Sequence, residues 1–254
     1  MIRKLFGHSL TLALVLSFQA APGDGVCADV QKLYLYAGAG MKKPMDVVIE
    51  KFKQVHGVEV VPNYGPSGGL YAQITKGQPC DIYYCADWMY IEKLEKDQLL
   101  IEKKKFLTDS IVVIVSKTGS AKITSFSDLT KEGVVLAVGD TRAPVGGYTE
   151  NGLKKLGLWD KIVAQGNIKA MPSTVNQIAI MVQEDQVDAG FVFKSVATMY
   201  GLKPVQTMGP DLTGEIVFGI GIIKGGNEAL ARKFMGFARE QVGEFTKYGW
   251  QAYE

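Results

Sequence analysis

The sequence predicts an α/β protein of two lobes, each a mainly parallel sheet flanked by helices. Strand-like and helix-like runs alternate from Gln31 onward, which is the pattern of repeated βα units. The chain has 254 residues, which is long for one simple doubly wound sheet, and it contains two sets of βα units of similar size. Loops of small residues follow the predicted strands and open the predicted helices.

The first lobe begins with three strand–helix pairs. Short apolar runs predict strands at residues 32–37, 58–64 and 80–86. Apolar residues at helical spacing predict helices at residues 45–57, 68–78 and 88–98. Gly57 is a typical stop signal for the first of these helices.

The alternation resumes in the second half of the chain, over residues 110–117, 125–133, 134–140, 148–163, 174–186 and 188–197. The first crossover between lobes is expected near residues 107–110. The return is expected near residues 201–213, because "GLKPVQTMGPDLTG" has the Gly/Pro density of a connection. The run "EIVFGIGII" and a final amphipathic helix ending in "TKYGW" then close back on the first lobe.

These features divide the chain into three parts. Residues 1–28 combine a basic start, an apolar run at residues 9–18 and small residues at a cleavage point, which is typical of a secretory signal peptide. The apolar run is shorter than the roughly 20 residues that span a bilayer. We expect residues 29–108 with 201–254 to form the first lobe and residues 109–200 the second. The mature protein is expected to be periplasmic.

Composition argues against several classes of function. Cleavage after Ala28 would remove two of the 28 basic residues and one of the 26 acidic ones, so the net charge would be +1. A nucleic-acid binder normally has a strong basic excess. His56 would be the one histidine left, in a solvated turn, which leaves little for a Ser–His–Asp triad or a multi-histidine zinc site. Cys80 and Cys85 flank a predicted strand, about 16 Å apart, and are expected to be separate buried thiols.

Four small-residue loops are candidates for a binding site. They are "AGAGM" at residues 37–41, "YGPSGGL" at 64–70, "GDTRAPVGGY" at 139–148 and "MPSTVNQ" at 171–177. Helix N-termini leave N–H groups free and carry about half a positive charge, so each can bind an anion. Thr174 and Gln177 fit a capping box, which places the Val175 amide at a helix start. In "PSGG", Ser67 would add a hydroxyl donor to a nest of amides. Taken alone, any one such loop is more often a plain connection between elements.

These loops, in this order, resemble those of the substrate-binding proteins of bacterial molybdate/tungstate ABC importers. The resemblance covers nearly the whole mature chain and is carried by "YAGAGMKKPMDVV", "GPSGGLYAQITKGQPCDIYYCAD", "SIVVIVSK", "LAVGDTRAPVGGYTENGLKKLGLWD" and "DAGFVFKSVATMYGL". It implies a periplasmic-binding-protein fold of type II that closes around a tetrahedral oxyanion in the cleft between its lobes. It also implies partnership with the permease and ATPase subunits of an importer.

The family's ligand positions transfer incompletely to this chain. The candidate ligand-binding residues are Gly40, Met41, Ser67, Gly68, Arg142, Val145, Val175 and Phe193. The family's first-loop serine falls on Gly40 and its tyrosine on Phe193, so two hydroxyl donors are lost. An archaeal branch places two carboxylates at the positions of Ala143 and Val192, so six-coordinate metal binding is not expected here.

The resulting expectation is a monomeric, non-enzymatic solute-binding protein for a small oxyanion, molybdate or tungstate first. No cofactor, and no metal other than that within the oxyanion, is expected. The alternative ligand is sulfate or a small phosphorylated or carboxylated metabolite, with Arg142 as a bidentate clamp and a wider pocket. A sensor's ligand-binding subunit is a further possibility. An exported enzyme is less favoured, because the loops offer only Asp140, Arg142, Lys42 and Lys43 as titratable groups. Solvated surface charge is the expected role of Lys42 and Lys43, and Tyr64 and Tyr148 are expected either to line the cleft or to pack in the core.

Overall fold

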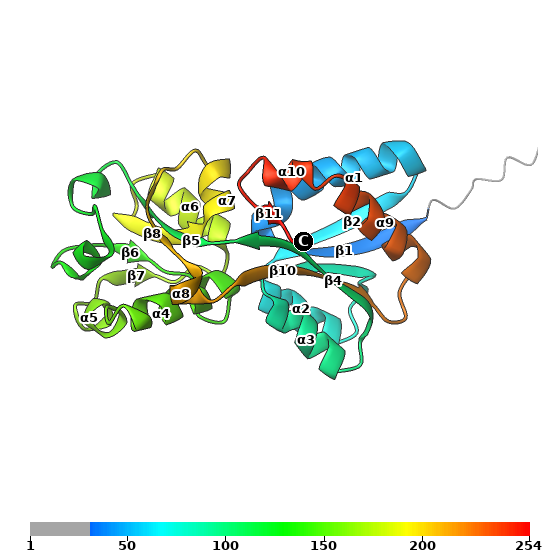
Figure 1. The fold of residues 1–254 in the computed structure, drawn as a ribbon, viewed down its shortest axis with the longest axis horizontal. Coiled ribbons are helices and arrows are strands. Elements are labelled where there is room, and N and C mark those ends of the chain that lie inside the picture. The colour runs from blue at the N-terminus through cyan, green and yellow to red at the C-terminus, as the bar shows by residue number, and fades with distance from the viewer. Residues whose placement is uncertain (1–30) are drawn as a thin grey trace, which may run out of the picture.

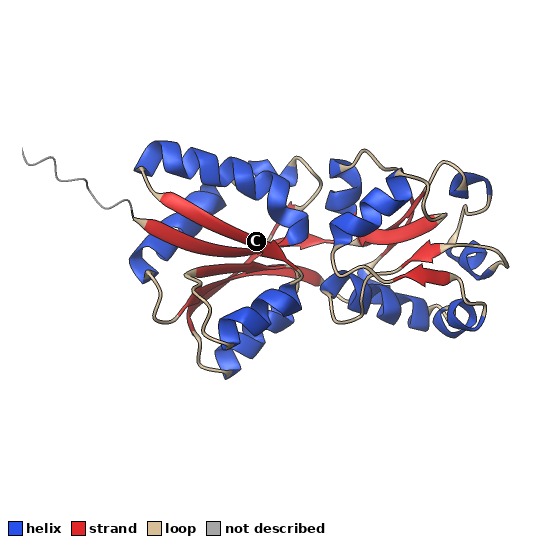
Figure 2. Ribbon diagram, turned by 180° about the vertical axis from the view of Figure 1, so that it is seen from behind, coloured by secondary structure: helices blue, strands red, loops and turns tan. Residues whose placement is uncertain are grey.

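The computed structural model describes residues 31–254, which form two α/β lobes side by side along the long axis of the molecule (Figure 1). The predicted signal peptide, residues 1–28, lies outside the described residues. Each lobe has one sheet with helices on both faces (Figure 2). The predicted fold class is therefore confirmed. Within residues 31–254, no helix is long and apolar enough to cross a membrane.

The first lobe contains a six-stranded sheet. Its order is β11 (Gln251–Ala252), β4 (Leu100–Asp109), β10 (Ile216–Ile223), β3 (Ile82–Cys85), β1 (Lys32–Gly38) and β2 (Glu59–Gly65). Its helices are α1 (Lys42–His56), α2 (Ser67–Thr75), α3 (Trp88–Lys96), α9 (Glu228–Glu240) and α10 (Gly243–Thr246), with a 3-10 turn, η1 (Ala39–Met41), before α1.

The second lobe contains a five-stranded sheet. Its order is β7 (Ile168–Ala170), β6 (Leu136–Ala137), β8 (Ala189–Phe193), β5 (Ile111–Val115) and β9 (Pro204–Met208). Its helices are α4 (Pro144–Lys155), α5 (Trp159–Ala164), α6 (Val175–Gln183), α7 (Lys194–Met199) and α8 (Pro210–Thr213), and its 3-10 turns are η2 (Gly119–Ala121) and η3 (Phe126–Thr130).

The sheets are more mixed than the prediction of mainly parallel strands. β1 pairs in parallel with β2 and β3, and β6 with β7 and β8. β10 is antiparallel to β3 and β4, and β5 is antiparallel to β8 and β9. The cause is the connection between lobes, because the strands that lead into and out of the second lobe run in opposite directions.

The predicted boundary at residue 201 is wrong in one respect. β9 pairs with β5 in the second sheet, and α8 packs against α4, so residues 204–213 belong to the second lobe. The chain passes to the second lobe between β4 and β5, at Ser110, and returns between α8 and β10. The sequence pattern does not predict the ten-residue strand β4, because its "EKKK" run has no apolar alternation.

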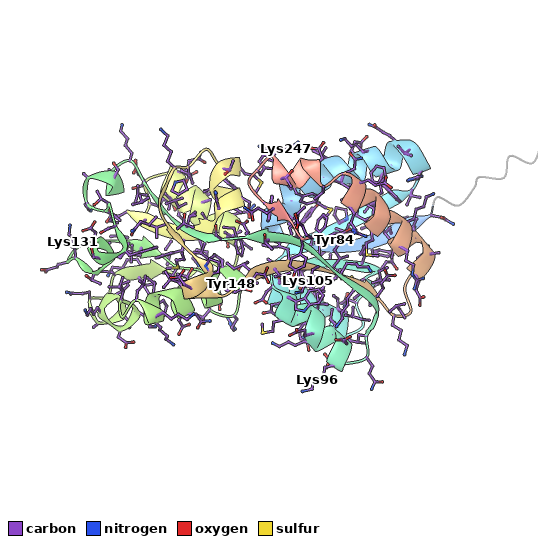
Figure 3. All side chains as sticks on the ribbon, in the orientation of Figure 1. Tyr84, Lys96, Lys105, Lys131, Tyr148 and Lys247 are labelled. Carbon is purple, nitrogen blue, oxygen red and sulfur yellow. The ribbon has the colours of Figure 1, made fainter. Side chains whose placement is uncertain are left out.

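Apolar side chains fill the interior, as the two sets of βα units require. Tyr84 lies inside the first lobe, whereas Lys96 and Lys131 project from the outer surface (Figure 3).

Cys80 and Cys85 are free, buried thiols as predicted, and burial raises the pKa of Cys85 to about 12. His56 is less solvated than predicted, because its ring packs edge-on against Phe52 with centroids 4.6 Å apart.

Candidate functional site

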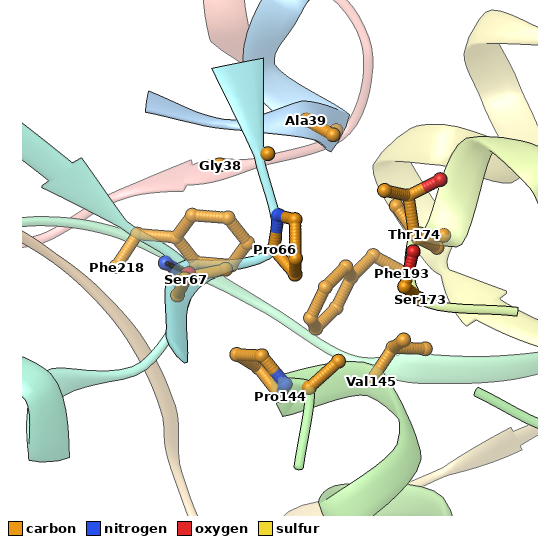
Figure 4. A pocket seen from close by; sticks show the side chains of 15 residues that line it. Gly38, Ala39, Pro66, Ser67, Pro144, Val145, Ser173, Thr174, Phe193 and Phe218 are labelled. Carbon is orange, nitrogen blue, oxygen red and sulfur yellow. Dashed lines mark hydrogen bonds between the residues drawn. The ribbon is translucent and has the colours of Figure 1, made fainter. Parts of the chain in front are cut away.

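A small cavity lies between the two lobes, where the loops after β1 and β2 face the starts of α4 and α6 (Figure 4). Its volume is about 30 Å³. One water needs about 10–15 Å³ by the same measure, so the space suits an ion of a few heavy atoms. The lining residues are all uncharged: Gly38, Ala39, Gly40, Gly65, Pro66, Ser67, Ala86, Ala143, Pro144, Val145, Ser173, Thr174, Val175, Phe193 and Phe218.

Three helices of at least nine residues begin at this cavity, one from the first lobe and two from the second. α2 starts at Ser67 and α4 at Pro144, and neither has a side-chain cap. Because proline has no N–H, the first free amide of α4 is that of Val145. α6 starts at Val175 behind the predicted Thr174–Gln177 capping box, which the structure shows. The cavity therefore receives amide donors and positive helix ends from both lobes.

Ser67 is held rigidly at the cavity wall and is 1 % exposed. Its Oγ accepts a hydrogen bond from the Ala86 amide at 3.1 Å, and its carbonyl accepts one from the Tyr83 hydroxyl at 2.8 Å. Since Oγ already serves as an acceptor, the hydroxyl proton remains free to point into the cavity. The serine is thus prepared to donate to an anion.

Gly40 lines the cavity at the contact between lobes. A Cβ at this position would lie 3.2 Å from Cγ1 of Val175 and 3.2 Å from Cγ2 of Val196, both in the second lobe. The glycine therefore permits close approach of the lobes, besides lacking the hydroxyl of the family's serine. Phe193 also lines the cavity and packs edge-on against Phe218, with ring centroids 5.3 Å apart.

The other predicted residues lie outside the cavity lining. Met41 is 1 % exposed and packs in the core of the first lobe. Gly68 and Arg142 line an adjoining hollow of about 420 Å³. The Arg142 side chain is 89 % exposed and donates to both oxygens of Asp140, at 3.0 and 2.6 Å. This pairing lowers the pKa of Asp140 to about 2, so the carboxylate stays ionised. The guanidinium is paired with it at the surface rather than placed in the cavity.

The remaining loop residues are placed on the surface or beside the cavity. The ammonium of Lys42 pairs with Asp46 at 2.7 Å and lies over the Tyr64 ring, and Lys43 lies over Tyr248. Ala143 lines the cavity, whereas Val192 is buried in β8 and does not. In residues 31–254 no three His, Cys, Asp or Glu side chains gather as a metal site.

Five of the fifteen lining residues were predicted to bind the ligand, and the others include Ser173, Thr174 and Phe218. Ser173 and Thr174 precede α6 and line the cavity (Figure 4), and the Thr174 hydroxyl donates to the Gln177 side chain at 2.9 Å. The sequence marks Thr174 as a cap but not as part of the lining. Phe218 comes from β10, the returning strand, and no local signal marks it, because only the tertiary fold brings β10 beside β8 of the other lobe.

Known proteins resemble this chain in sequence and in fold. Residues 33–251 match the family model of bacterial extracellular solute-binding proteins. The molybdate-binding protein ModA of Escherichia coli (strain K12) is 29% identical, over 95% of this chain and 96% of that protein. The periplasmic molybdate-binding protein of Azotobacter vinelandii aligns in structure with a TM-score of 0.78 at 23% identity, over 87% of this chain and 100% of that one. The sulfate-binding protein SubI of Mycobacterium tuberculosis H37Rv aligns with a TM-score of 0.72 at 18% identity, over 88% of each chain.

Proposed function

Because the chain belongs to the bacterial extracellular solute-binding proteins, which are binders and not enzymes, we propose that it captures molybdate or tungstate for an ABC importer. The observation that carries this proposal is the cavity of about 30 Å³ between the lobes. It is lined without a single charged side chain, yet the N-termini of α2, α4 and α6 open onto it.

Uncharged donors suit a fully deprotonated tetrahedral oxyanion. Amide N–H groups and the Ser67 hydroxyl donate, and the helix ends supply positive potential without a counter-ion to desolvate. A hydrogen bond to a charged group contributes about 1.5–3 kcal/mol, so a handful of such donors supports tight capture. A phosphate that carries a proton would in addition need an acceptor, and the lining offers no carboxylate for this purpose.

Size is the proposed basis of discrimination among dianions. Oxyanions of equal charge differ mainly in radius, and the fixed helix starts define one cavity radius when the lobes are closed. Closure replaces the water around the anion with fixed dipoles, and the closed shape is the form that a permease can recognise. The protein is proposed to act in the periplasm as a monomer, with the permease and ATPase subunits of the importer as partners.

The alternative ligand, a sulfate or an organic phosphate or carboxylate clamped by Arg142, fits the geometry less well. The guanidinium is already paired with Asp140 and is directed to solvent. A clamp would require this ion pair to break and the side chain to turn inward. The likeness to molybdate-binding proteins, which covers almost the full chain, favours the same ligand class.

Isothermal titration calorimetry tests the proposal directly. Purified protein would be titrated with molybdate, tungstate, sulfate, selenate, chromate and phosphate under identical salt and pH. We expect 1:1 binding that is tightest for molybdate and tungstate, with a matching rise in melting temperature. Binding of an organic phosphate or carboxylate, with no heat from any inorganic oxyanion, would refute the proposed ligand.

A further inference from the structure

Beside the anion cavity, a tyrosine of the first lobe is hydrogen-bonded to the backbone of the second. Tyr90 lies on α3 and is 6 % exposed. Its hydroxyl donates to the Arg142 carbonyl, in the loop before α4, at 2.9 Å. Neither Tyr90 nor Arg142 lines the anion cavity; both line the two hollows next to it. The bond therefore joins the lobes without touching the space for the anion.

A second tyrosine, from the second lobe, lies across from a carboxylate of the first lobe. Tyr148, on α4 of the second lobe, lines one of these hollows together with Asp87, which caps α3 in the first lobe and accepts from the Met89 amide at 2.9 Å. Burial and the interaction with Asp87 raise the pKa of Tyr148, so its hydroxyl stays protonated and can donate. Figure 3 shows Tyr148 on the side of the second lobe that faces the first.

Gly68 fits this arrangement sterically. A Cβ at position 68 would lie 2.6 Å from the Tyr90 hydroxyl and 3.2 Å from the Arg142 carbonyl. The second residue of α2 must therefore be glycine if the Tyr90–Arg142 hydrogen bond is to form. At Gly69, the next residue, an added Cβ would have only Pro66 ring atoms within 4 Å, the nearest at 3.3 Å. A side chain at position 68 would therefore collide with the Tyr90 hydroxyl, whereas one at position 69 would not.

We propose that Tyr90 and Tyr148 form a latch that sets how firmly the lobes close, and thereby how long any anion stays bound. The contacts across the seam exist only when the lobes meet, so they favour the closed state over the open one. Apparent affinity scales with the population of the binding-competent state, so a weaker latch lowers the affinity for every anion by the same factor. Tyr90 and Tyr148 are positioning residues here, and the proposal rests on the proposed interlobe binding of anions.

The variants Tyr90→Phe, Tyr148→Phe and the double variant test the latch. Dissociation constants and dissociation rates for molybdate, tungstate and sulfate would be measured by calorimetry and stopped-flow competition. Each single change is expected to weaken binding about 3- to 10-fold, mostly through faster dissociation, with the ratios among the three anions unchanged. Gly68→Ala is expected to behave like Tyr90→Phe, and Gly69→Ala, as the matched control, like the unaltered protein.

Small-angle scattering of the anion-free protein provides a readout that does not depend on the ligand. The double variant is expected to have a larger radius of gyration than the unaltered protein, because its lobes spend more time apart. Unchanged dissociation rates and an unchanged radius in the double variant would overturn the latch. So would a loss confined to one anion, since that result indicates direct contact. If the unaltered protein binds none of the anions, the proposed function fails, whereas the scattering comparison still decides on the latch.

Discussion

Replacing Ser67 with alanine removes the hydroxyl that we propose donates to the anion, and the expected loss can be worked from the structure. Oγ accepts from the Ala86 amide at 3.1 Å, which leaves the hydroxyl proton available to donate to the anion. Loss of one hydrogen bond to a charged group costs about 1.5–3 kcal/mol, which corresponds to about 10- to 150-fold weaker binding.

The same substitution also has a cost that does not depend on the anion. The Ala86 amide loses its acceptor inside the protein, and an unsatisfied buried donor costs about 1–3 kcal/mol. This loss lowers the melting temperature of the anion-free protein by several degrees. Affinity and stability should therefore both fall, for separate reasons.

Tyr83→Phe is the control that separates the two effects. The Tyr83 hydroxyl donates to the Ser67 carbonyl at 2.8 Å, and Tyr83 itself does not line the cavity. Its removal should lower the melting temperature while leaving anion affinity within about threefold, because the donor on Ser67 remains. Calorimetric titration with molybdate, paired with thermal unfolding, measures both quantities. Binding by Ser67→Ala within about twofold of the unaltered protein would refute the role of this hydroxyl.

Three further substitutions give distinct expectations. Gly40→Ser restores the family's hydroxyl, but its Cβ meets two valine methyls at 3.2 Å, and valine on a helix has few alternative rotamers. Calorimetry should therefore show binding about fivefold weaker or worse, and tighter binding would contradict the steric account. Arg142→Ala should leave molybdate affinity within about threefold, because the side chain is exposed and paired with Asp140; a large loss would favour the clamped alternative ligand. Burial at the hinge raises the pKa of Asp109 to about 7, so the native state holds a proton that the unfolded chain releases near pH 4. The contribution of this group to the free energy of unfolding is therefore largest below about pH 4. It falls by on the order of 1.4 kcal/mol per pH unit as the pH rises to about 7. Asp109→Asn should lack this slope in denaturant unfolding, and equal slopes in both proteins would contradict the assignment.

Much of the fold could be read from the sequence because strand–loop–helix units carry local signals. Apolar runs and helical spacing located the elements of both lobes, and the Thr174–Gln177 capping box located the start of α6. Ser67 stood out as the lone hydroxyl among chain-bending residues, and the structure places it at the cavity wall. These features depend on residues close together in the chain.

Features that depend on distant partners could not be read in this way. Strand β4 is polar and half-exposed, and it is held by pairing with β10, which lies far along the chain. Phe218 reaches the cavity only because β10 returns beside the second lobe. The side chain of Arg142 turns outward because Asp140 captures it, which residue identity in the loop does not reveal. The requirement for glycine at position 68 comes from the Tyr90 hydroxyl, which lies on a different helix.

Anomalous diffraction from crystals grown with tungstate tests most directly whether neutral donors from both lobes hold one anion. The predicted result is a single metal peak in the cavity between lobes. The oxygens around that peak should lie about 2.7–3.2 Å from the Ser67 hydroxyl and from the amides of Val145 and Val175. A peak beside the Arg142 guanidinium, or a metal ion contacted by one lobe alone, would contradict the account.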